Sequence, residues 1–69
     1  MTEVELWTVY NHPLDFPDKY VARRFLNDKP TKEIKVGGTL NAVRSQLPRG
    51  LTNIGRQSGD DPFIEEVWI

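Results

Sequence analysis

The sequence predicts an α+β protein in which one short helix lies on one face of a mostly antiparallel sheet of three or four strands. Three observations indicate this class. Four short runs are rich in β-branched and aromatic residues or alternate apolar with polar ones. One run has helical spacing, and prolines and glycines separate the runs. The 69 residues allow a single domain, residues 1–69, with the order β-β-β-α-β.

The first two strands are expected at residues 4–10 and 20–26, antiparallel to each other. The connector between them, NHPLDFPD, contains Pro13 and Pro17, which exclude a helix there. Such dense proline and aspartate content is typical of a rigid loop. Residues 27–30 form a turn cluster, and residues 32–36 alternate as a short third strand with one solvated face.

The helix is expected just after Gly37 and Gly38. Thr39 is a favourable N-cap residue, because its hydroxyl accepts a hydrogen bond from an unpaired amide of the first turn. An apolar stripe follows and Pro48 ends it after barely two turns; the stripe is Leu40, Val43 and Leu47. A helix this short is stable only when it packs on the sheet. Residues 63–69 complete the sheet as the last strand.

One short helix covers only one sheet face, so the other face is expected to be partly open. If Phe63, Val67 and Ile69 face the helix, Trp68 lies on the open face. Trp7, in the first strand, is the second tryptophan. Two tryptophans on an uncovered face would form a binding surface. The alternative is that one or both belong to the core.

Charge is unevenly spread, although the net charge is only −1. Residues 1–18 carry four acidic residues and no basic one, whereas residues 19–37 carry six lysines or arginines against two acidic residues, a net charge of +4. One interpretation is that acidic and basic strands pair side by side. The other is a basic face that meets an anionic partner. Arg23, Arg24 and Arg56 could then contact phosphates, with Tyr20 and Phe25 stacking on bases. The sequence pI of about 5.7 argues against a dedicated nucleic-acid binder.

Catalytic and metal-binding signals are weak. His12 is the only histidine, with Asp15 and Asp18 nearby, and there is no cysteine. Metal sites usually need three or four ligands, and no serine has the context of a nucleophile. The acidic run of Asp60, Asp61, Glu65 and Glu66 lacks calcium-loop spacing. We therefore expect no enzyme activity, no metal, no cofactor and no small-molecule substrate.

The absence of cysteine indicates a reducing compartment. The first residues lack the features of a secretory signal, and no apolar run approaches the roughly 20 residues that span a bilayer. A cytoplasmic location without membrane contact is the expectation.

The run YNHPLDFPDKYVARRF resembles short hypothetical proteins of bacteria and their phages that carry the pattern Y-x-H-P-x-D-x-P-x-x-x-V-A-R-R. The later runs TLNAVRSQLPRGL and GDDPFIEEVW look like the rest of those proteins. The resemblance implies a phage or prophage context. It carries over no catalytic residue.

The predicted function is a small non-catalytic protein-binding module, of the kind with which a phage binds or inhibits a host protein complex in anti-defence. The alternative is a nucleic-acid-binding accessory protein that uses residues 19–37. The partner is a host protein or a second copy, pairing through an open edge of the first or last strand. The candidate partner-binding residues are Trp7, His12, Asp15, Arg23, Arg24, Arg56 and Trp68.

Overall fold

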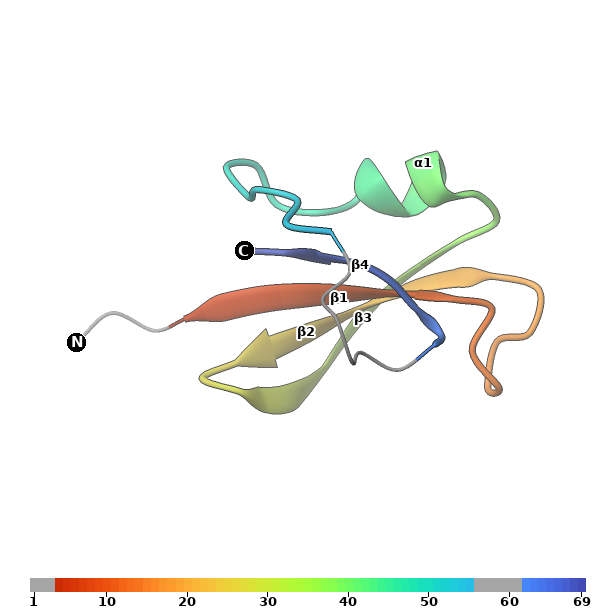
Figure 1. The fold of residues 1–69 in the computed structure, drawn as a ribbon, viewed down its shortest axis with the longest axis horizontal. Coiled ribbons are helices and arrows are strands. Elements are labelled where there is room, and N and C mark those ends of the chain that lie inside the picture. The colour runs from red at the N-terminus through yellow and green to blue at the C-terminus, as the bar shows by residue number, and fades with distance from the viewer. Residues whose placement is uncertain (1–3, 56–61) are drawn as a thin grey trace.

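The computed structural model describes residues 4–55 and 62–69, and it confirms the predicted class and element order (Figure 1). The elements are β1 (Glu5–Asn11), β2 (Tyr20–Leu26), β3 (Lys29–Gly37), α1 (Leu40–Arg44) and β4 (Ile64–Trp68). The strands form one antiparallel sheet in the order β3-β2-β1-β4. β4 therefore adds to the free side of β1 and brings the last residues beside the first strand.

The helix and the segment after it lie on one side of the sheet (Figure 1), here called the helix face. Trp7 and Val9 of β1 and Ala22 of β2 are buried there against Val43 of α1. Around this core pack five half-buried residues: Tyr20, Leu40, Leu47, Leu51 and Trp68. Because side chains alternate along a strand, Tyr10, Val21 and Arg23 lie on the opposite face, here called the second face.

The turn between β2 and β3 consists of two residues, and is therefore shorter than the turn predicted at residues 27–30. Asn27 and Asp28 both have positive φ, 51° and 66°, as a two-residue type I′ hairpin turn requires. Lys29 and Pro30 already pair with β2. Proline is tolerated in β3 because β3 is an edge strand, and the backbone on its outer side forms no hydrogen bonds to another strand of the sheet.

The helix forms where its cap and stripe predict it. The Thr39 hydroxyl accepts a hydrogen bond from the Ala42 amide at 3.1 Å. Val43 is fully buried, and Leu40 and Leu47 pack beside it. These three residues confirm the predicted apolar stripe. The regular part spans only five residues, so packing on the sheet supplies its stability.

Gly37 lets the helix approach the end of β3. A β-carbon at this position would lie 2.9 Å from the Ala42 Cβ, 2.9 Å from the Val43 Cγ2 and 3.0 Å from the Val43 amide nitrogen. Atoms of a real side chain do not approach so closely without displacing a neighbour. A glycine is thus required by packing, not by backbone conformation.

We expect Gly37→Ala to lower the free energy of unfolding by about 1–3 kcal/mol, because the added methyl group pushes α1 away from the sheet. Gly38→Ala is the matched control, since a β-carbon at Gly38 meets nothing within 4 Å. Urea unfolding followed by circular dichroism measures both. Equal effects of the two substitutions would show that the close approach at Gly37 does not limit stability.

The edge of β4 is covered by a short segment. Thr52 and Ile69 exchange backbone hydrogen bonds at 2.6 and 3.0 Å, and the Ile54 amide donates to the Val67 carbonyl at 2.9 Å. β1 lies inside the sheet. The expectation of an open edge is therefore wrong for the first strand. The last strand, β4, is an edge strand as expected, and the 52–54 segment covers its Val67–Ile69 end. Pairing with a second copy stays a prediction. At the other edge of the sheet, β3, Pro30 and several lysines disfavour pairing with another strand.

Candidate functional site

The two tryptophans do not form an exposed aromatic surface. Trp7 is 0% exposed in the centre of the core, and Trp68 lies opposite it across the β1–β4 pair, half-buried on the same helix face. The alternative that the tryptophans belong to the core is confirmed, with Trp7 inside it and Trp68 packed against it. The condition that would have turned Trp68 away from the helix is not met. Phe63 and Ile69, expected to face the helix, are 40% and 47% exposed.

Glu66 explains why the apolar pattern of β4 misleads. This glutamate is only 4% exposed and occupies the helix face beside Trp68. Its carboxylate accepts hydrogen bonds from Arg44 Nε at 2.7 Å, Arg44 Nη2 at 2.6 Å, Asn53 Nδ2 at 2.8 Å and Trp68 Nε1 at 3.0 Å. The bonds from Arg44 above all hold the pKa of Glu66 below its usual value, against the effect of burial. A buried charge is tolerated when it is this fully paired.

Glu5 repeats the arrangement on β1. Its carboxylate accepts from Trp7 Nε1 at 3.1 Å and from Arg24 Nε at 2.9 Å, and Arg24 Nη2 lies 2.9 Å away. These bonds, that of Trp7 first, lower the pKa of Glu5. The interpretation that acidic and basic strands pair side by side is confirmed for Glu5 and Arg24. Arg24 is thereby engaged within the fold.

The connector between β1 and β2 is held by its own backbone. The Phe16 amide donates to the Pro13 carbonyl at 2.9 Å, and the Lys19 amide donates to the Phe16 carbonyl at 3.1 Å, which makes two successive turns. The His12 amide closes the base by donating to the Lys19 carbonyl at 3.0 Å. The exposed His12 has a positive φ of 49°, and its ring meets Tyr20 edge-on at 5.1 Å. Through these contacts His12 helps to hold the shape of the connector.

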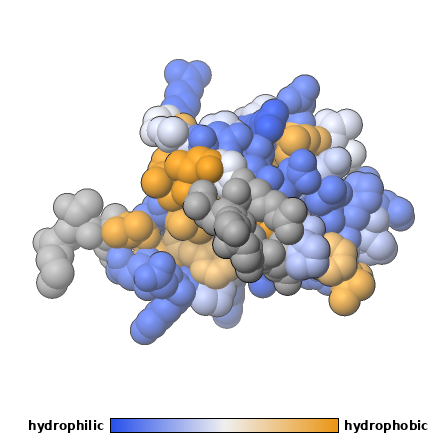
Figure 2. Space-filling view, in the orientation of Figure 1, coloured by the Kyte–Doolittle hydropathy of each residue, from blue (hydrophilic) through white to orange (hydrophobic). Residues whose placement is uncertain are grey.

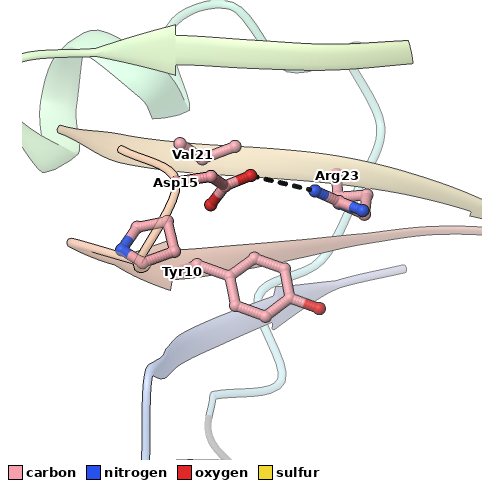
Figure 3. Close-up of a pocket in the computed structure, with 5 residues that line it drawn as sticks. Tyr10, Asp15, Val21 and Arg23 are labelled. Carbon is pink, nitrogen blue, oxygen red and sulfur yellow. Dashed lines mark ion pairs between the residues drawn. The ribbon is translucent and has the colours of Figure 1, made fainter. Parts of the chain in front are cut away.

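A pocket lies where this connector folds over the second face (Figure 3). Its volume is about 240 Å³. Pro13 and Asp15 come from the connector, Tyr10 from β1, and Val21 and Arg23 from β2. Val21, which is 1% exposed, is the apolar floor, and Arg23 lies at one end. The site combines apolar walls with one ion pair.

Arg23 is less well paired than the other two arginines. Its Nη2 lies 3.7 Å from Asp15 Oδ2, which is longer than a hydrogen bond. Its Nε is buried and has no hydrogen-bond partner. Both side chains of the pair are substantially exposed, 38% for Arg23 and 60% for Asp15, so the ion pair is weak.

The pocket thus brings together two of the seven candidate partner-binding residues, Asp15 and Arg23. The structure places Trp7, Trp68 and Arg24 on the helix face, and Arg56 lies outside the described residues. Sequence reasoning missed Tyr10, Pro13 and Val21 as pocket walls. The two-residue spacing of Val21 and Arg23 on β2 would have indicated that these two share a face. That Tyr10 joins them follows only from the register, in which Tyr10 pairs with Val21.

No group of three or more histidine, aspartate or glutamate side chains converges within residues 4–55 and 62–69. Asp60 and Asp61 of the acidic run fall outside that part of the chain, and within it Glu65 is exposed whereas Glu66 is buried. The described helix is too short and polar to cross a membrane.

The fold and pocket define a small α+β domain with a recessed site on the second face of its sheet. Comparison with protein-family models, with curated proteins and with solved structures found no match.

Proposed function

We propose that this protein is a non-catalytic protein-binding module that contacts its partner with the connector between β1 and β2. The observation that carries the proposal is Leu14, which is 87% exposed at the tip of the double turn. Its chain neighbours Pro13 and Asp15 both line the pocket. Figure 2 shows hydrophobic surface projecting at the end of the molecule where Figure 1 places the connector.

A single exposed leucine is ordinary, and its setting is what matters here. Turn positions usually hold proline, glycine or polar residues. This leucine is held by the Phe16–Pro13 bond across its turn, and the base of the loop is closed at His12. A backbone fixed in this way loses little conformational freedom on binding, so more of the contact energy of Leu14 contributes to affinity.

Retention of a partner from a bacterial lysate by the immobilised chain tests the proposal. We expect Leu14→Ser to abolish retention of a protein that the unchanged chain holds at physiological salt. Val4→Ser is the matched control, because Val4 is also exposed, 59%, but lies before β1 at the other end of that strand. Failure to retain any protein, or equal retention by Leu14→Ser, would contradict the proposal.

Inhibition of a host complex remains a prediction, and so does a phage origin, which the resemblance implies. Nucleic-acid binding by residues 19–37 also remains a prediction, with less support. Arg24 is engaged by Glu5, and Tyr20 and Phe25 lie on opposite faces of β2, so they do not form one stacking platform. A gel-shift titration at low salt checks it.

A further inference from the structure

Three arginines of the chain can be compared, because each has a carboxylate within 4 Å. Arg44 presents its Nε and Nη2 to the two oxygens of Glu66 at 2.7 and 2.6 Å. Arg24 presents the same two nitrogens to one oxygen of Glu5, both at 2.9 Å. In both cases a glutamate satisfies the Nε side of the guanidinium.

Among the residues that the structure describes, Arg23 lacks such a partner. Its Nε is buried without an acceptor, and the Asp15 carboxylate oxygen lies 3.7 Å from Nη2. A buried donor without an acceptor costs free energy that a suitable ligand recovers. The Nε–Nη2 edge of a guanidinium matches a carboxylate, which it binds in a planar, two-bond geometry.

We propose that the pocket beside Arg23 binds a carboxylate on a short apolar stem, presented by an acidic side chain of a protein partner. The inference rests on the proposed function and names the group that the partner inserts. Val21 and Pro13 supply the apolar walls for the stem, and Arg23 receives the charge at the end of the pocket (Figure 3). Glutamate is the residue that fills the equivalent position at Arg24 and Arg44.

Binding requires a small rearrangement of the pocket. Because Arg23 Nε is covered, the guanidinium must turn toward the pocket before both nitrogens can donate to the ligand. The loose pair with Asp15 opposes this motion only weakly, since exposed ion pairs contribute little to stability. The incoming carboxylate thus takes the place of Asp15 as the partner of Arg23.

Nuclear magnetic resonance of the arginine Nε–H groups tests this exchange directly. The probe is glutamate capped as N-acetyl and N-methylamide, with the glutamine analogue as the uncharged control. For a ligand of about 14 heavy atoms we expect a dissociation constant of roughly 1 mM, from about 0.3 kcal/mol per atom. The Arg23 Nε–H signal should shift saturably, whereas those of Arg24 and Arg44 should not.

Variants of neighbouring residues sharpen the test. Arg23→Lys keeps the charge but removes the two-bond edge, so saturable shifts of the Val21 amide should disappear. Arg24→Lys, one residue along on the other face, should retain them. Asp15→Asn should bind the capped glutamate about two- to fivefold more tightly, because the competing carboxylate is gone.

Three results would overturn the inference: no saturation up to about fifty times the expected constant, an equal response to the glutamine analogue, or an equal response at Arg24. Tighter binding of N-acetylleucine, whose carboxylate is terminal, would overturn the assignment to a side chain. Leu14 does not line the pocket. Leu14→Ser can therefore abolish partner retention even if the capped glutamate does not bind to the unchanged chain. The two proposals therefore fail separately.

Discussion

Trp7→Ala is expected to remove most of the free energy of unfolding. Trp7 is the largest fully buried side chain, and truncation of a buried tryptophan or phenylalanine costs about 3–5 kcal/mol. The stability of a domain this small lies near the lower end of the usual range, about 5 kcal/mol. The substitution also removes the indole donor of Glu5. Far-ultraviolet circular dichroism in a urea series measures the loss.

Trp68→Ala is the matched comparison for Trp7→Ala. Trp68 is the cross-strand neighbour of Trp7 on the same face, but it is only half-buried. We expect a cost of about 1–2 kcal/mol, since less apolar area returns to water. A loss at Trp68 as large as the loss at Trp7 would contradict the placement of the core centre at Trp7.

Glu66→Gln is expected to lower the free energy of unfolding by about 2–3 kcal/mol at neutral pH. The amide keeps the shape of the side chain but removes the charge that Arg44 meets at 2.6 Å, and it presents a donor where Asn53 and Trp68 also donate. These contacts tie α1 and the 52–54 segment to β4, so their loss loosens one end of the sheet. Glu65→Gln is the control, because Glu65 is exposed and accepts only a 3.3 Å bond from Asn11 among the contacts described. Urea unfolding of both variants measures the difference.

The same pair contributes to the acid sensitivity of the fold. The folded-state pKa of Glu66 lies below its ordinary value of 4.5, so its stabilising effect is fully present above about pH 4.5. That contribution is lost as the pH falls through the lowered folded-state pKa, and Glu5 adds a change of the same sign. Urea unfolding from pH 7 to pH 2.5 should therefore show a steeper decline for the unchanged chain than for Glu66→Gln. Parallel curves would exclude Glu66 as a source of the acid sensitivity.

Local rules were sufficient for the elements and their order. Pro13 and Pro17 excluded a helix from the connector, and Thr39 with the stripe of Leu40 and Val43 located α1, because caps, prolines and periodicity act over a few residues. The uneven charge allowed acidic and basic strands to lie side by side as one of two interpretations, and the Glu5–Arg24 pair bears that one out for the first two strands.

The site depended on contacts between residues far apart in the sequence. Apolar alternation assigned the wrong face to Trp68, because a charged residue, Glu66, lies on the core face once Arg44, Asn53 and Trp68 pair with it.

The sequence by itself therefore determined an α+β chain with a rigid connector between two strands. The tertiary structure alone decided that the tryptophans face the helix, that Asp15 meets Arg23, and that Leu14 is left exposed beside their pocket. The physical reason is that the free energy of a buried charge or an exposed apolar side chain depends on the partners that folding brings to it.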